Sequence, residues 1–174
     1  MKILLHICCG VCAAGVVDTL TGQGHSVTGF FYNPNIYPAA EYDKRLEASR
    51  EVSRRMGFEL IEGEYDRAPW CEVSRGMEKD PEGGARCREC FRLRLAKTHD
   101  YFLEGQFDMF TTTLTVSPKK TAGVVNKVGL EMSAKSFLQA DFKKKEGFKK
   151  AVELARCWDI YRQDYCGCEY SIRR

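Results

Sequence analysis

Short apolar runs alternate with longer amphipathic stretches along the chain. The runs at 2–7, 26–32, 58–61 and 109–113 have the length of buried strands, and a shorter run at 136–138 is a candidate fifth strand. Helical periodicity follows most of these runs; the clearest is a stripe formed by Tyr42, Leu46, Ser49, Val52 and Met56. Further helices are expected up to about 21 and at 66–76, 87–104, 118–131 and 147–158. This alternation predicts an α/β fold with a mostly parallel, doubly wound sheet of about five strands and a helical C-terminal part.

The carboxyl ends of such a sheet are where ligands collect. Four segments should meet at that edge because each follows a predicted strand: Cys8–Cys12, Asn33, Thr111–Thr113 and the segment around Asp141. We therefore expect the chemistry of the protein at this edge.

The length of 174 residues suits one domain covering 1–174, and we find no repeat, low-complexity tract or linker. Hydrophobic residues make up 44% and charged residues 29%, which is typical of a soluble globular protein. No apolar run approaches the roughly 18–20 residues of a membrane span. The N-terminal apolar stretch is too short for a signal peptide, so a cytoplasmic location is expected, where thiols stay reduced.

The net charge of +3 is unevenly distributed. Between 117 and 150 there are nine lysines against three acidic residues, so this segment carries +6 and the rest of the chain −3. The asymmetry suits an anionic partner such as nucleic acid, while a solvated lysine-rich helix face is the alternative. The lysines at the candidate interface are Lys119, Lys120, Lys143, Lys144 and Lys145.

Nine cysteines is a high count for a chain of this kind. An odd number without a signal peptide argues against a disulfide framework. Two of the cysteine groups, Cys8-Cys9-Gly10-Val11-Cys12 and Cys87-Arg88-Glu89-Cys90, each precede or open a predicted helix. Helix N-termini favour negative charge, so the two ends are suited to one thiolate-ligated metal centre.

Two ligand sets remain open for that centre. A tetrahedral zinc ion would use Cys9, Cys12, Cys87 and Cys90. A [4Fe–4S] cluster would use Cys8, Cys9, Cys87 and Cys90, with Cys12 beside it. Adjacent cysteines chelate a single small ion awkwardly, whereas a cluster spreads its ligands over four irons. The spacing therefore favours the cluster.

The third cysteine group is Cys166-Gly167-Cys168 near the C-terminus. A disulfide across one residue closes a small, strained ring, and strained disulfides are the labile, catalytic kind. Extra metal ligands or ordinary thiols are the alternatives. Cys71 and Cys157 stand alone and are expected to pack in the interior.

Taken together, these motifs resemble the QueH-type epoxyqueuosine reductases over nearly the whole chain. The resemblance rests on an ordered set of segments: His6 with Cys8–Cys12, Asn33–Pro38 with Glu41, Tyr42 and Arg45, Arg86–Cys90, Thr111–Leu114 with Ser117 and Pro118, Asp141–Lys143, and Tyr161–Gln163 with Tyr165–Cys168. Such a set is far more specific than any single pair of cysteines.

The resemblance implies the last step of queuosine biosynthesis, in which the epoxide of epoxyqueuosine in a tRNA anticodon loop is reduced to give queuosine and water. It implies a sheet of the adenine-nucleotide α-hydrolase (HUP-like) type, with Cys8–Cys12 where related enzymes keep a phosphate loop. It also assigns Cys8, Cys9, Cys87 and Cys90 to a [4Fe–4S] cluster and Cys166 with Cys168 to a redox-active pair.

A cluster ligated entirely by cysteine has no free iron to bind the epoxide oxygen. We hypothesise that Cys12 with Asp141 holds a second metal, such as a mononuclear iron, or that Cys12 acts directly as a thiol. The lysines would bind tRNA phosphates without reading sequence. The electron donor is not predictable from the sequence. A zinc-stabilised RNA-binding module without catalysis is the alternative from a different functional class.

Overall fold

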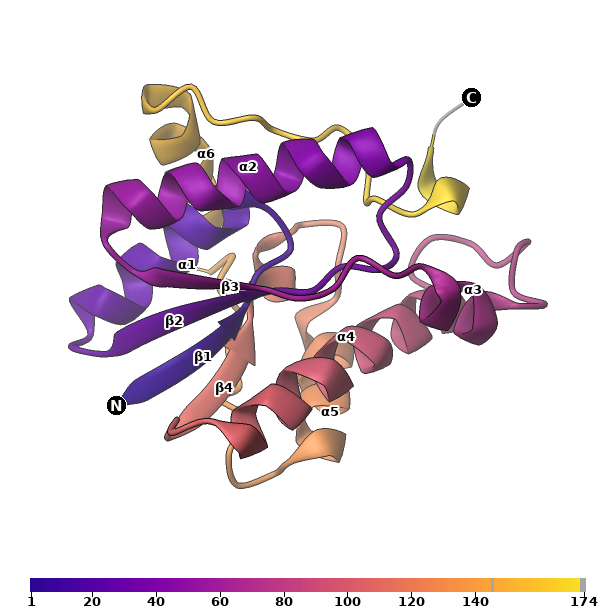
Figure 1. Cartoon of the computed structure of the whole chain (residues 1–174), viewed down its shortest axis with the longest axis horizontal. Helices are drawn as coiled ribbons and strands as arrows, with labels where there is room; N and C mark the ends of the chain where they lie inside the picture. The colour runs from indigo at the N-terminus through magenta and orange to yellow at the C-terminus, as the bar shows by residue number, and fades with distance from the viewer. Residues whose placement is uncertain (145, 173–174) are drawn as a thin grey trace.

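The sheet of the computed structural model, which describes residues 1–144 and 146–172, has four parallel strands in the order β3-β2-β1-β4 (Figure 1). The strands are β1 (Lys2–His6), β2 (Ser26–Phe31), β3 (Glu59–Glu62) and β4 (Met109–Thr112). Parallel pairing joins β1 to both β2 and β4. β1 is therefore an inner strand, and its run of Ile3, Leu4 and Leu5 is fully buried, as expected for a strand covered on both faces.

Helices cover both faces of this sheet, as predicted for a doubly wound fold. They are α1 (Gly10–Gly22), α2 (Ala39–Met56), α3 (Ala68–Ser74), α4 (Ala85–Glu104), α5 (Ala122–Met132) and α6 (Gly147–Cys157). Helix α1 packs against α2 and α6 on one face, and α4 packs against α5 on the other (Figure 1). Two 3₁₀ turns, η1 (Thr113–Val116) and η2 (Glu169–Ser171), complete the described elements.

Helix α1 packs closely against its neighbours because two of its glycines let them approach. A Cβ atom at Gly10 would lie 2.5 Å from the carbonyl oxygen of Ala48 on α2. A Cβ atom at Gly15 would lie 2.7 Å from the Cβ of Ala151 on α6. Since Cys9 and Cys12 flank or lie in the first turn of α1, this packing also fixes the position of the first cysteine group.

The predicted fifth strand is reduced to one bridge between Phe110 and Phe137 in the described residues. Phe110 exchanges backbone hydrogen bonds with Ser136 and Leu138, each 2.9 Å long. Beyond this bridge, side chains bond the backbone carbonyls: the Thr111 hydroxyl donates to that of Leu138 at 2.9 Å, and the Asn126 amide donates to that of Ala140 at 3.1 Å. The predicted number of about five strands was thus one too high for the described residues.

The strand order produces a switch point between β1 and β4. From β1 the chain passes outward through β2 and β3, and it then returns to the other side of β1 as β4. Ligands of open parallel sheets bind in the crevice at such a point, beyond the carboxyl ends of the strands. Cys8 follows β1 and Thr113 follows β4 at this place. Among the described residues, no helix has both the length and the apolar character needed to cross a membrane.

Candidate active site

The first cysteine group forms a compact set of sulfur atoms at the end of β1. The ligand atoms of Cys8, Cys9 and Cys12 all lie within 4.8 Å of one another, and the three residues are buried. Cys9 is the extended N-cap of α1, and Cys12 lies one turn into the helix, so the helical turn brings the sulfurs together. Among the described residues, this is the one group of three or more His, Cys, Asp or Glu side chains close enough together to hold a metal ion.

Hydrogen-bond donors surround these sulfurs. The Thr113 hydroxyl donates to Cys8 Sγ at 3.2 Å, and the Gln163 side-chain amide donates to Cys9 Sγ at 3.1 Å. Hydrogen bonds from Cys12 and Cys9 lower the pKa of Cys8 well below its ordinary value, with help from the charges of Lys120 and Arg94. The same hydrogen bonds, together with burial, hold the pKa of Cys12 well above it. Within the group, Cys8 is therefore the sulfur that loses its proton most readily.

The second cysteine group lies at the N-terminus of α4, where Gly84 is the N-cap. The backbone N–H of Gly83 donates to Cys87 Sγ at 3.2 Å. Cys90 is buried in a small cluster with Trp70 and Cys168, and burial raises its pKa to about 12. Cys87 and Cys90 are not part of the compact set around Cys8, so the four predicted cluster ligands lie in two groups.

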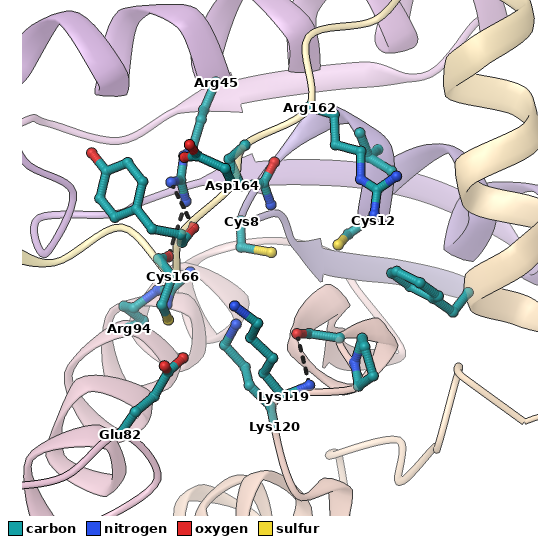
Figure 2. Close-up of a pocket in the computed structure, with 16 residues that line it drawn as sticks. Cys8, Cys12, Arg45, Glu82, Arg94, Lys119, Lys120, Arg162, Asp164 and Cys166 are labelled. Carbon is teal, nitrogen blue, oxygen red and sulfur yellow. Dashed lines mark hydrogen bonds between the residues drawn. The ribbon is translucent and has the colours of Figure 1, made fainter. Parts of the chain in front are cut away.

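The third cysteine group lies beside the second. Cys168 packs against Cys90, and Cys166 lines a cavity together with Cys8 and Cys12 (Figure 2). Burial raises the pKa of Cys87, against the hydrogen bond from Gly83, which lowers it. Cys166 and Cys168 are free thiols in the structure, and the redox-active disulfide stays a prediction.

Arg45 of α2 holds this C-terminal segment in place. Its guanidinium donates to the carbonyls of Cys166 at 3.0 Å and Tyr165 at 3.1 Å. Glu41 accepts from Arg45 Nε at 2.6 Å and from the Tyr161 hydroxyl at 2.6 Å. No role was predicted for Arg45. The four-residue spacing of Glu41 and Arg45 on one helix was the sequence signal for their ion pair, but not for the bonds to the C-terminal segment.

The cavity has a volume of about 470 Å³ and opens beside Cys8, Cys12 and Cys166. Five cationic side chains line it, against two acidic ones, Glu82 and Asp164. The cations are Arg45, Arg94, Lys119, Lys120 and Arg162, and the two lysines point into the cavity (Figure 2). Burial alone would lower the pKa of Lys120, but the nearby cysteine thiolates outweigh it and leave the pKa above its ordinary value. The cavity thus suits an anionic ligand.

The other predicted lysines differ in orientation. The Lys143 ammonium group turns inward, donating to the carbonyl of Lys120 at 3.0 Å and lying 3.4 Å from Asp141 Oδ1. Lys144 is exposed, as is Lys119 at the cavity, and Lys145 lies outside the described residues. Asp141 does not line the cavity, and among the described residues it is not part of the cysteine group.

The prediction that Cys71 and Cys157 pack in the interior was wrong, because both are exposed. Cys71 lies on α3, whose buried residues are Trp70 and Ser74. Cys157 is the last residue of α6, which buries Ala151 and Ala155. Each cysteine thus falls on the outer side of an amphipathic helix.

A thiolate-ligated metal centre fits the residues present. The sulfurs are buried, helix N-termini face them, and Thr113 and Gln163 donate to them. One donor next to the cavity, Arg94 Nε, is buried without a hydrogen-bond partner among the described residues. Sulfur-rich clusters accept such hydrogen bonds, and these bonds are among the factors that set their potentials.

Solved structures share this fold. A predicted subunit of tRNA methyltransferase from Methanocaldococcus jannaschii gives a TM-score of 0.60 at 12% identity, covering 90% of this chain and 74% of that one. The U34-tRNA thiolase NcsA from Methanococcus maripaludis, solved with its [4Fe-4S] cluster, gives 0.59 at 14% identity, covering 99% and 62%. At such low identity the likeness establishes the fold alone.

Sequence comparison establishes the family as well as the fold. A family model described as epoxyqueuosine reductase QueH matches residues 3–174. The QueH protein of Streptococcus pyogenes serotype M1 is 38% identical over 181 residues, which cover 99% of this chain and 71% of that protein. The QueH protein of Haemophilus influenzae is 35% identical over 176 residues, covering 99% and 72%. The chain belongs to the QueH family of epoxyqueuosine reductases, as its ordered motifs predicted.

Proposed function

We propose that this protein reduces epoxyqueuosine in the anticodon loop of tRNA to queuosine, the last step of queuosine biosynthesis. The observation that carries the proposal is the family match over residues 3–174. The buried thiol group beside a cationic cavity is consistent with it. A tRNA substrate would also place the enzyme in the cytoplasm, as the sequence predicts.

The proposed cofactor is a [4Fe–4S] cluster held by Cys8, Cys9, Cys87 and Cys90. When bound, it would supply electrons one at a time. The chain provides buried sulfurs from two helix N-termini, and Thr113 and Gln163 donate hydrogen bonds to two of those sulfurs. Arg94 lies between the two groups, since it contacts Cys90 and lines the cavity next to Cys8.

The reaction consumes two electrons and two protons. Both carbon–oxygen bonds of the epoxide break, a carbon–carbon double bond forms, and the oxygen leaves as water. Oxidation of Cys166 and Cys168 from two thiols to one disulfide releases two electrons and two protons, which balances one turnover. Cys166 lines the cavity, so its thiol can face a bound substrate. An external reductant, whose identity the sequence does not indicate, would reduce the disulfide again.

Cys12 and Asp141 were predicted to hold a second metal. Cys12 lies in the compact sulfur group and lines the cavity, which supports a role at the substrate. Asp141 pairs with Lys143 instead, so Cys12 acting as a thiol is the better supported of the two hypotheses. Mössbauer spectra of a Cys12→Ala variant test this: loss of a mononuclear iron signal would favour the second metal, and unchanged iron would favour the thiol.

The cavity has the size of a small-molecule site, within the usual range of about 300–1,000 Å³. A modified base would have to leave the anticodon stack to enter it, as enzymes that act on bases require. We expect the exposed Lys119 and Lys144 to bind the flanking phosphates. Sequence recognition would come from the splayed bases of the loop.

The direct test uses the anaerobically reconstituted full chain with epoxyqueuosine-containing tRNA and a chemical reductant. Digestion to nucleosides and mass spectrometry should show loss of one oxygen from the modified nucleoside. A Cys8→Ala variant, lacking one proposed ligand, should show no conversion. Protein that carries its full iron and sulfide but leaves the nucleoside unchanged would overturn the proposed activity. A colourless protein that binds one zinc and tRNA would instead support the RNA-binding alternative.

A further inference from the structure

Arg94 is a buried cation that lacks a carboxylate partner in the described part of the chain. The residue is 2% exposed. Its Nη2 donates to Asn33 Oδ1 at 2.5 Å and its Nη1 to Cys90 Sγ at 3.8 Å, while Nε has no partner. A buried charge without a counter-charge is costly, so some anion is expected to compensate it.

The other two buried arginines among the described residues differ from Arg94 in what they contact. Arg45 is paired with Glu41 at 2.6 Å. Arg86, whose Nε also lacks a partner, donates to two backbone carbonyls, those of Met77 at 2.6 Å and Glu78 at 3.2 Å. Arg94 instead contacts the sulfur of a proposed cluster ligand, Cys90, and lines the cavity, and neither Cys90 nor Asn33 gives it a fixed negative charge.

The position of Arg94 indicates what the missing anion is. It lies one turn after Cys90 on α4, and its side chain extends toward the cavity that Cys8 and Cys166 also line (Figure 2). Asn33 is held by its own bond from Nδ2 to the carbonyl of Ile7 at 2.9 Å, which keeps its oxygen turned toward Arg94. The guanidinium is thus fixed between the first and the second cysteine group.

We propose that Arg94 is the counter-charge of the metal centre and a positioning residue that raises its reduction potential. The inference rests on the proposed cluster. A [4Fe–4S] core with four thiolates carries a charge of −2 when oxidised and −3 when reduced. A fixed cation in a buried site stabilises the more negative form most, and net charge and hydrogen bonds to sulfur are among the factors that set cluster potentials.

The experiment is a redox titration followed by electron paramagnetic resonance, on the anaerobically reconstituted full chain. In Arg94→Gln, the ratio of reduced to oxidised cluster at a fixed solution potential should fall at least tenfold, which is about 59 mV for one electron. Arg94→Met is a second neutral variant that places no polar group in the buried site. Arg94→Lys keeps the charge and should restore most of the ratio.

Arg92→Gln is the matched control, because it removes a positive charge two residues away on the same helix. Arg92 lies toward the solvent and pairs with Glu131 at 2.8 Å, so its removal should leave the ratio unchanged. Iron and sulfide are measured in every sample. Wild-type protein without iron would refute the proposed cofactor, a failure distinct from that of Arg94.

The remaining outcomes decide the role of Arg94. A neutral variant with full iron and an unchanged ratio would overturn the proposal, as would Arg92→Gln causing an equal shift. If both neutral variants fail to load iron while Arg94→Lys loads it, the charge is needed to hold the centre, which supports the proposal. If Arg94→Lys also fails to load iron, Arg94 serves the fold through its shape and the proposal is wrong.

Discussion

The Thr113 hydroxyl accepts the backbone N–H of Cys8 at 3.0 Å and donates to the Cys8 sulfur at 3.2 Å. One side chain thus binds both the backbone and the side chain of a residue 105 positions away. Because Cys8 follows β1 and Thr113 follows β4, the contact joins the two strands at the switch point of the sheet. It also holds the sulfur of Cys8, whose pKa is lowered while those of Cys9 and Cys12 are raised.

Replacing Thr113 by valine should destabilise the protein by about 1–3 kcal/mol. Valine has nearly the same shape, but it leaves the N–H of Cys8 buried without a partner. Urea unfolding of the metal-free protein measures the effect. Thr113→Ser keeps the hydroxyl and should lose clearly less of the free energy of unfolding. Equal losses in the two variants would mean that the hydrogen bonds of Thr113 do not stabilise the protein.

Gly10→Ala should cost about 1–3 kcal/mol of stability because the new methyl group would press on the backbone of Ala48. The backbone of α2 cannot rotate away as a side chain can, so α1 and its cysteines must shift. Thermal unfolding gives the stability.

Gly22→Ala is the control in the same helix, since nothing lies within 4 Å of its Cβ position. It should leave stability unchanged or raise it by about 0.4–1 kcal/mol, because alanine reduces the freedom of the unfolded chain. Similar effects at both glycines would contradict the close packing of α1 on α2.

His6 predicts a pH dependence of stability. The imidazole is fully buried, Nδ1 lies 2.8 Å from the Thr112 hydroxyl and Nε2 lies 3.2 Å from the carbonyl of Tyr32. Since a carbonyl only accepts, Nε2 carries the proton and Nδ1 accepts from Thr112. Burial, aided by the charge of Arg94, lowers the pKa of His6 to about 3.

In the unfolded chain His6 binds a proton near pH 6.5, whereas in the folded protein it does so only near pH 3. The contribution of neutral His6 to the free energy of unfolding is therefore fully present above pH 6.5. Below pH 6.5 the free energy of unfolding falls by about 1.4 kcal/mol per pH unit. The stability difference between wild type and His6→Gln, measured by urea unfolding at pH 7.5 and 5.5, should fall at the lower pH. A constant difference would show that His6 is charged in the folded protein.

Cys166→Ala and Cys168→Ala should keep the iron and sulfide of the wild type but lose turnover, the first one included. Each variant removes one half of the proposed two-electron store and leaves the proposed cluster ligands untouched. Rapid-quench product counts against enzyme concentration separate the first turnover from later ones. Cys157→Ala, at an exposed thiol outside the site, is the control; loss of iron in either active-site variant would refute the separation of roles.

The salt dependence of tRNA binding should identify the phosphate contacts. Lys119→Ala and Lys144→Ala should each flatten the slope of log affinity against log salt by about 0.7–0.9. Lys97 is exposed on α4 and does not line the cavity, so Lys97→Ala should leave the slope unchanged. Equal slopes in all the variants would place the tRNA elsewhere.

Much of the fold was predictable because β1 and its neighbours are continuous apolar runs bounded by turns. The grouping of Cys8, Cys9 and Cys12 was predictable as well, since one helical turn is enough to bring them together. The shortening of the fifth strand to one bridge was not predictable, because the carbonyls of Leu138 and Ala140 bond to the side chains of Thr111 and Asn126, 27 and 14 positions away.

The parts of the site that sequence reasoning missed depend on contacts between distant segments. Arg45 donates hydrogen bonds to the backbone carbonyls of Tyr165 and Cys166, which lie 120 and 121 positions later in the chain. No local sequence pattern predicts such bonds. Arg94 lies four residues after Cys90, and its contacts with Cys90 and Asn33 beside the cavity distinguish it from the other arginines of α4.

The most direct test of the account is the iron and acid-labile sulfide content of the chain purified without oxygen. We predict a brown protein with about four irons and four sulfides per chain, which fall sharply when Cys8 or Cys90 is replaced by alanine. A colourless protein with one zinc and neither iron nor sulfide would contradict the account.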